Sequence, residues 1–189
     1  MITIAPEPRN DRHNEFWTWF GDFVKIEGIE SMLEIGCGDG ANSELVGRYT
    51  GIDRDVGSVS TGMRKYPGIH LIHGDWLSIS EDELHNGYDL VLAAGVVERC
   101  PHYREFIKKA VGVGAPWTII TFWHGLDEDC DRMMTRGGPG PGWSYDNHYS
   151  ERVLLGWLAE NGYGERHEMQ TFPSARRGQE ECALIIRGE

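Results

Sequence analysis

The sequence predicts a single α/β domain, residues 1–189, built on a mostly parallel sheet with helices on both faces. Short apolar segments suited to strands alternate with segments of helical period, which is typical of parallel strands joined by crossover helices. One junction, LEIGCGDGANSELV at residues 33–46, connects a strand to a helix through a glycine-rich turn. The 189 residues suffice for one sizeable core and contain no repeat or linker.

Composition narrows the classes of function. The chain is 40% hydrophobic and 25% charged, with a formal net charge of −12, so its surface is a poor match for nucleic acid. No stretch approaches the ~20 apolar residues of a membrane span, and no leader pattern opens the chain. The four cysteines form no C-x-x-C pair. We therefore expect a cytoplasmic protein that acts on a small molecule, with no metal site.

The N-terminal part divides into an arm and a helix. Residues 1–12 are polar and contain two prolines, which favours an extended arm. Residues 13–28 predict a helix, because their apolar side chains fall on one stripe: Phe16, Trp19, Phe20, Phe23 and Val24. The simplest interpretation is that this helix packs on the sheet.

The glycine-rich turn is the first candidate binding feature. An apolar strand at 32–35 leads into the turn at 36–40, where glycine permits positive φ and a close approach of the backbone to a ligand. A helix expected over 41–48 would present free N–H groups at the same place. Together they indicate a site for a nucleoside-containing cofactor.

The middle of the chain continues the alternation of strands and helices. Asp53 ends a strand at 49–53, and Asp75-Trp76 follow a strand at 69–73, so two acids lie at carboxyl ends of neighbouring strands, where ligands bind in open α/β sheets. The remaining expected elements are a helix at 56–65, a short helix at 80–85, a strand at 88–93, a helix beginning near Tyr103 and a strand at 117–123.

The C-terminal third has a different character. Residues 124–149 are rich in glycine and proline at 137–142, without apolar period, and predict a long substrate-facing loop. Ser150 is placed to cap a helix that ends near Gly162. Two strands at 164–172 and 182–187 complete the chain.

The segments LEIGCGDG, GIDRD, HGDW and YDLVLAAGV together resemble the class I, Rossmann-like, S-adenosylmethionine-dependent methyltransferases. The resemblance covers residues 29–123 well. It implies S-adenosyl-L-methionine as cofactor and a seven-stranded sheet of order 3-2-1-4-5-7-6 with one antiparallel strand. It also implies that the N-terminal helix could close over the cofactor and give Trp17 or His13 a contact role.

The resemblance further implies a set of cofactor-binding residues. Glu34 would hold the amino group of the cofactor, Asp53 would accept from the ribose hydroxyls, and Asp75 would accept from adenine. The alternative for this last region is that Asp75 caps a turn and Trp76 belongs to the core. The full set is Glu34, Gly36, Cys37, Gly38, Asp53, Arg54, Asp75, Trp76, Ala94 and Gly95.

The acceptor side is less defined. Glu98-Arg99 stands where the family often has Glu-His, so we assign a catalytic role to Glu98 and look elsewhere for a base. His124, directly after the strand at 117–123, is the first choice, although a structural role is the commoner one for a lone histidine. The cluster Trp143, Tyr145, Asn147 and His148 either lines an acceptor pocket or anchors the loop.

Several functions remain open. The leading prediction is O- or N-methylation of a small molecule. An NAD-type oxidoreductase is the first alternative, since Gly36, Gly38 and Ala41 fit its glycine pattern, but the acid at Glu34 argues against it. A non-catalytic subunit that binds S-adenosylmethionine is the second. The order Cys100-Pro101 argues against a cysteine nucleophile, and the alternating acids at 127–131 lack the glycine and glutamate of a calcium loop.

Overall fold

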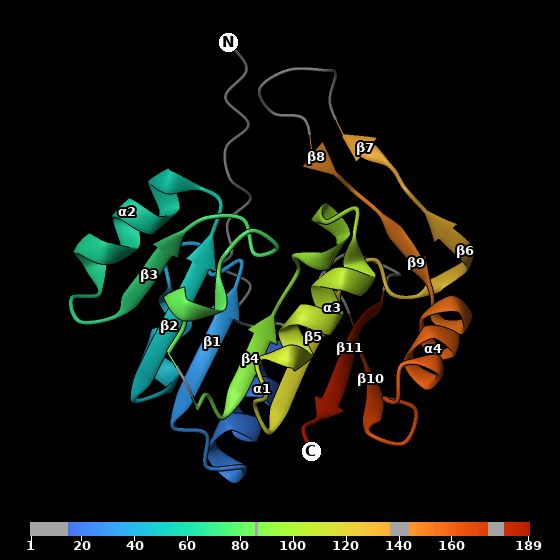
Figure 1. The fold of residues 1–189 in the computed structure, drawn as a ribbon, viewed down its shortest axis with the longest axis horizontal. Coiled ribbons are helices and arrows are strands. Elements are labelled where there is room, and N and C mark those ends of the chain that lie inside the picture. The colour runs from blue at the N-terminus through green and yellow to red at the C-terminus, as the bar shows by residue number, and fades with distance from the viewer. Residues whose placement is uncertain (1–14, 86, 137–143, 174–179) are drawn as a thin grey trace.

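The structure is a computed structural model that describes residues 15–85, 87–136, 144–173 and 180–189. The described residues form a seven-stranded main sheet of order β10-β11-β5-β4-β1-β2-β3 (Figure 1). These strands are β1 (Ser31–Ile35), β2 (Arg48–Asp53), β3 (His70–His73), β4 (Leu90–Ala93), β5 (Trp117–Phe122), β10 (His167–Pro173) and β11 (Glu180–Arg187). Numbered along the chain, they run 3-2-1-4-5-7-6, and β11 is antiparallel to both neighbours. The predicted fold class is confirmed.

The central strands are buried because both faces of the sheet are covered. Every residue of β1 and β4 is buried. Successive side chains point to opposite faces, so Met32 joins the apolar cluster on one side and Leu33 the cluster on the other. The apolar clusters on the two faces therefore support the carboxyl edge of the sheet from both sides.

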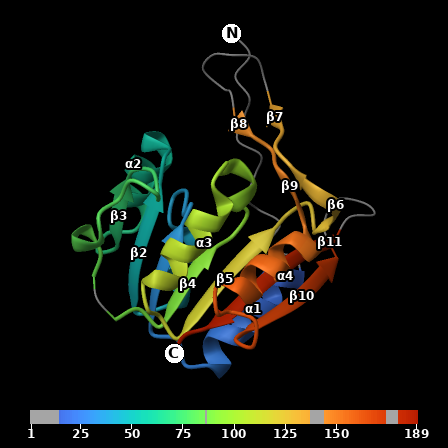
Figure 2. The same cartoon turned by 45° about the vertical axis from the view of Figure 1, so that its right-hand side comes forward.

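Four helices make these layers (Figure 1 and Figure 2). Helices α1 (Glu15–Ile26) and α2 (Val56–Lys65) contribute to the cluster on one face, and α3 (Tyr103–Gly112) and α4 (Glu151–Glu160) to the cluster on the other. The ring of Phe16 on α1 lies 5.5 Å from that of Phe172, and Trp17 packs on Phe16 and Phe20. Helix α1 packs on the sheet, as in the simpler interpretation; His13 lies outside the described residues.

The structure corrects the helix expected over 41–48. Only a short 3₁₀ helix, η1 (Ala41–Leu45), follows the glycine turn, because the chain is already extended at Val46 and β2 begins at Arg48. A single turn has little macrodipole. Two further 3₁₀ turns, η2 (Glu81–Glu83) and η3 (Val97–Arg99), follow β3 and β4.

The structure also corrects the loop expected over 124–149. Strand β6 (Asp127–Arg132) pairs antiparallel with β9 (His148–Ser150), and β7 (Thr135–Arg136) with β8 (Ser144–Tyr145). These four strands, residues 127–150, are named the hairpin arm. The arm rises beyond the carboxyl edge of β5 (Figure 2). Residues 137–143, which include Trp143, lie outside the described residues.

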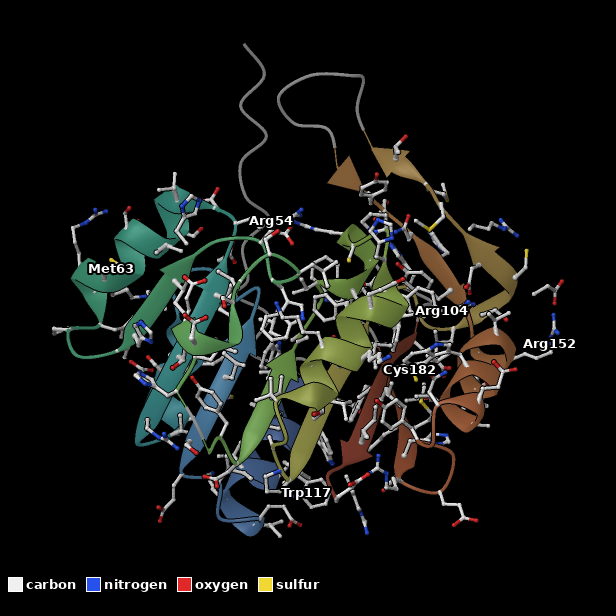
Figure 3. All side chains as sticks on the ribbon, viewed as in Figure 1. Arg54, Met63, Arg104, Trp117, Arg152 and Cys182 are labelled. Atoms are coloured by element: carbon white, nitrogen blue, oxygen red, sulfur yellow. The ribbon has the colours of Figure 1, made fainter. Side chains whose placement is uncertain are left out.

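The two edges of the main sheet differ in content. Arg54 lies at the carboxyl edge and Trp117 at the opposite edge (Figure 3). A cavity of about 620 Å³ lies at the amino ends of β1 and β2, at the opposite edge from the glycine turn. Asp89, one of the acids that line it, accepts hydrogen bonds from the backbone of Glu30 and from Ser31. In the described residues no helix is long and apolar enough to cross a membrane.

Candidate functional site

The glycine turn after β1 has a backbone that only glycine tolerates. Gly36, Gly38 and Gly40 have φ of +75°, +58° and +74°. A Cβ on Gly36 would lie 2.2 Å from Cγ2 of Val96. The N–H groups of Gly36 and Cys37 both donate to the carbonyl of Ile52, at 2.7 and 3.1 Å. The turn is thereby fixed against β2 with its backbone at the carboxyl edge.

Asp53, the last residue of β2, is tied to this turn. Its Oδ2 accepts from the N–H of Gly38 at 2.6 Å, and its Oδ1 from the N–H of Asp55 at 2.8 Å. The residue is partly exposed. An ionised carboxylate accepts about four hydrogen bonds, so these two leave capacity for two hydroxyl groups of a ligand.

Glu34 lies beneath the turn rather than in an open position. It is 3% exposed; the hydroxyl of Tyr49 donates to Oε2 and Nδ2 of Asn42 donates to Oε1 at 2.9 Å. Burial, and then the charge of Glu34, raises the pKa of Tyr49 well above its usual range. Cys37 is equally buried, and its thiol packs under Gly51. Both side chains therefore lie in the interior, beneath the glycine turn.

The region predicted to bind adenine contains one solvent-exposed ion pair and one core residue. The guanidinium of Arg54 lies 3.6 Å from Asp75 Oδ2, both side chains being about half exposed. Asp75 Oδ1 also accepts from the N–H of Leu77 at 3.0 Å. Trp76 is 4% exposed, and its indole N–H donates to Phe106 of α3 at 3.4 Å. The alternative interpretation of Asp75-Trp76, a turn cap and a core residue, therefore describes their contacts.

The turn after β4 is packed against the end of β5. The N–H of Gly95 donates to Oγ1 of Thr121 at 3.0 Å, and a Cβ on Gly95 would lie 1.9 Å from the Trp123 ring. The guanidinium of Arg99 lies 5.4 Å from the centre of that ring. Ala94 is partly exposed. This close packing brings η3 and the end of β5 into one region.

Glu98, in η3, is a buried carboxyl group at this junction. Its Oε1 accepts from the N–H of Trp123, while Oε2 is buried without a partner. Burial raises the pKa of Glu98 from its ordinary value to about 8, and the nearby charge of Glu181 adds to the effect. Burial therefore favours the protonated form of Glu98, which can act as a hydrogen-bond donor.

His124 follows β5 and meets the hairpin arm. Its Nε2 lies 3.0 Å from Oδ1 of Asp146, and its ring stacks on that of His148 with centres 4.1 Å apart and planes at 10°. The side chain is only 7% exposed, and Nδ1 is buried without a partner. The structure thus brings His124 together with two residues far along the chain.

Two members of the cluster predicted at 143–148 make different contacts. Asn147 anchors the arm: its Nδ2 donates to the carbonyl of Cys100 at 3.1 Å, and its Oδ1 accepts from the N–H of Met134 at 3.0 Å. The hydroxyl of Tyr149 approaches the same carbonyl. His148 instead faces His124. Sequence reasoning missed Asp146. In an extended segment, side chains two positions apart share a side, so the candidate His148 could have indicated that Asp146 lies beside it.

A comparison with protein families found a match to the central part of the chain. Residues 33–121 match the family model described as "Methyltransferase domain". This segment is a methyltransferase domain. Its match begins in β1 and ends in β5, so it spans the glycine turn, Asp53, Asp75 and Glu98. A comparison with curated proteins found no match.

Solved structures share the fold of this methyltransferase at low sequence identity. The N-terminal domain of EvdMO1, solved with SAH bound, is 16% identical with a TM-score of 0.67, covering 89% of this chain and 79% of that one. The magnesium protoporphyrin IX methyltransferase of Synechocystis PCC 6803, solved with bound SAM, is 14% identical with a TM-score of 0.66, covering 98% and 86%. A Burkholderia thailandensis 1,6-didemethyltoxoflavin-N1-methyltransferase is 12% identical with a TM-score of 0.66, covering 92% and 81%.

Proposed function

We propose that this methyltransferase uses S-adenosyl-L-methionine to methylate oxygen or nitrogen of a small molecule. The observation that carries the proposal is the hydrogen bond between Asp53 and the glycine turn, which puts a carboxylate with free acceptor capacity beside the backbone of that turn. The related structures solved with SAM or SAH support the choice of cofactor. When bound, this cofactor supplies a methyl group activated by a positive sulfur.

The residues of the carboxyl edge fit such a ligand. Gly36 and Gly38 would let the backbone lie against its methionine and ribose portions, and Asp53 would accept from the ribose hydroxyls. Glu34 is only 3% exposed, so it would reach the amino group through Asn42 or a water. Arg54 and Asp75 would border the adenine, with Trp76 supporting the turn from the core. Ala94 and Gly95 would border the amino-acid portion, and Cys37 would contribute only its backbone.

The acceptor side is supplied by the ends of β4 and β5 together with the hairpin arm. Glu98 would hold a proton near the acceptor, and His124 would remove one where the acceptor must lose it. Similar folds are named for methylation of a porphyrin, a toxoflavin precursor and an amino pentose, which supports a small-molecule acceptor. Four free cysteines fit a reducing, cytoplasmic location.

Calorimetric titration with SAM, SAH and NADH tests the cofactor. We expect SAM and SAH to bind wild type, and Asp53→Ala to weaken both by about 100-fold or more, because charge-assisted hydrogen bonds contribute roughly 1.5–3 kcal/mol each. Asp22→Ala, an exposed acid on α1, is the matched control and should bind like wild type. Binding of NADH alone would contradict the proposal and favour the oxidoreductase alternative.

A second measurement separates catalysis from simple binding. Purified protein is incubated with SAM carrying a labelled methyl group and a panel of small phenols, carboxylic acids and sugar amines, and transfer of label is measured. Transfer that Asp53→Ala abolishes supports an enzyme. The same assay is run with small-molecule extracts of cells as the source of acceptor. If the protein binds SAM tightly but transfers no methyl group in any of these assays, the alternative of a non-catalytic, SAM-binding subunit is favoured.

A further inference from the structure

Unsatisfied buried polar atoms are concentrated beside the acceptor region. In the part of the chain that the structure describes, three buried side-chain polar atoms have no hydrogen-bond partner: Nδ1 of His70, Oε2 of Glu98 and Nδ1 of His124. Glu98 accepts from the N–H of Trp123, the residue directly before His124, so two of the three atoms belong to one neighbourhood. Such atoms are costly, and they persist where a ligand, water or substrate satisfies them.

The partner of His124 determines which ring nitrogen is free. An ionised carboxylate can only accept hydrogen bonds, so at 3.0 Å from Asp146 the neutral imidazole carries its proton on Nε2. Nδ1 then has an unshared electron pair. Because the side chain is only 7% exposed and Nδ1 is buried, bulk water does not occupy that position freely. The arrangement is that of a base whose Nε2 is held by a carboxylate and whose Nδ1 has no partner within the protein.

His148 fixes the plane of the ring. The two imidazoles are nearly parallel, 10° apart, with centres separated by 4.1 Å. Asp146 and His148 are two positions apart on the returning segment of the arm and both contact His124, whereas Asn147 and Tyr149, on the alternate positions, bind the carbonyl of Cys100. One side of this segment therefore holds the histidine, and the other attaches the arm to the turn after β4.

We infer that Asp146 and His148 are positioning residues that hold His124 with Nδ1 toward the acceptor, and that the acceptor is protic. This inference rests on the proposed methyltransferase function and names the class of its substrate: a hydroxyl or N–H compound whose nucleophilic atom must lose a proton. A thioether or a tertiary amine loses no proton on methylation and would need no such base.

The reaction balances with these groups. The acceptor oxygen or nitrogen forms a bond to the methyl carbon, the bond between sulfur and that carbon breaks, and its electron pair remains on sulfur, which becomes neutral. The proton of the acceptor moves to Nδ1 of His124, which becomes an imidazolium still donating from Nε2 to Asp146. Its charge is stabilised by that carboxylate, and the proton is afterwards released to solvent.

The tautomer of His124 can be measured without any substrate. Protein labelled with ¹⁵N in histidine is examined by long-range ¹H–¹⁵N NMR at a pH where the ring is neutral, and His124→Gln identifies the signal. We expect the Nε2–H tautomer in wild type and loss of that preference in Asp146→Asn, because an amide can donate as well as accept. Asp129→Asn, an exposed acid of the same arm, is the control. An Nδ1–H tautomer in wild type, or no change in Asp146→Asn, overturns the inference.

Activity gives the second, independent readout. On the acceptor that receives the most labelled methyl, His124→Gln and Asp146→Asn should lower kcat by about 10²- to 10⁴-fold with little change in KM. Calorimetry of the same variants should give wild-type affinity for SAM. If the best acceptor has no exchangeable proton on the methylated atom, the inference is wrong; if wild type fails to bind SAM, the proposed function fails instead. If no probe is methylated, the measured tautomer of His124 in wild type and Asp146→Asn decides whether the inference stands.

Discussion

The cofactor edge and the acceptor edge of this methyltransferase are held by different kinds of interaction. At the ends of β1 and β2, backbone hydrogen bonds and glycine conformations hold the site in place: the N–H of Gly38 donates to Asp53, and the N–H of Gly36 donates to the carbonyl of Ile52. At the end of β5, side chains hold other side chains, as His124 does with Asp146 and His148.

This difference explains how one fold serves many acceptors. A site made from backbone conformation changes little when surrounding side chains are exchanged, whereas a pair of side chains depends on both members. The hairpin arm attaches through Asn147 and Tyr149, whereas Asp146 and His148, on the alternate positions of the same segment, contact His124. We therefore expect cofactor binding to be sensitive to backbone changes and acceptor choice to side-chain changes.

The largest effect should come from Gly36→Ala. The new Cβ would meet Val96 at 2.2 Å in a left-handed backbone, so we expect a loss of about 2–5 kcal/mol in the free energy of unfolding and loss of detectable SAM binding. Gly28→Ala is the control: its φ is +64° but nothing lies within 4 Å, so it should cost about 1–2 kcal/mol and keep SAM affinity. Chemical denaturation and calorimetry measure both. Equal effects of the two variants would show that crowding at the turn is unimportant.

The next effect should be the pH dependence contributed by Glu98. Because burial raises the folded-state pKa to about 8, the folded protein binds more protons than the unfolded chain between about pH 5 and 8. Wild type should therefore lose stability as pH rises through this window, by up to about 1.4 kcal/mol per pH unit, relative to Glu98→Gln. Urea denaturation at several pH values measures the difference.

The control for this prediction is Glu44→Gln, at an exposed position of η1. It should follow wild type at every pH. A wild-type protein that parallels Glu98→Gln across the window would mean that Glu98 is ionised in the folded state, and would remove it as a proton donor in the acceptor region.

Asn147→Ala should have a smaller effect, confined to the acceptor edge. Removing the amide leaves the N–H of Met134 and the carbonyl of Cys100 without this partner, which costs about 1–3 kcal/mol. Hydrogen exchange should accelerate in β9 and remain unchanged in β1. Asn161→Ala, an exposed amide at the end of α4, should cost less than about 0.5 kcal/mol. Unchanged exchange in β9 would show that Asn147 does not anchor the arm.

The smallest effect should come from Arg54→Ala at the cofactor edge. Its ion pair with Asp75 is about half exposed, so we expect a change below about 0.5 kcal/mol in stability and no more than about threefold in SAM affinity. Lys65→Ala, which removes the comparable pair with Asp39, is the control. A tenfold loss of affinity confined to Arg54→Ala would assign the guanidinium a direct contact with the cofactor.

Much of the cofactor edge was predictable because its signals are local. A glycine turn after a buried strand and an acid at the end of the next strand are short patterns with fixed backbone consequences. The same logic failed for residues 41–48, where η1 replaces the expected helix, because helical propensity cannot foresee how soon the next strand begins. Trp76 was equally open, since the sequence does not reveal that α3 covers it.

The sequence by itself determined where the strands of the main sheet and the glycine turn lie along the chain, because strand period and glycine conformation act within a few residues. The order of those strands in the sheet was implied by the resemblance to the methyltransferases. Tertiary structure alone decided that residues 124–149 form a paired arm and that His124 meets Asp146 and His148. Those contacts depend on how the arm folds back over β5. That return is fixed by Asn147 and Tyr149 binding the turn after β4, an interaction between segments almost 50 residues apart.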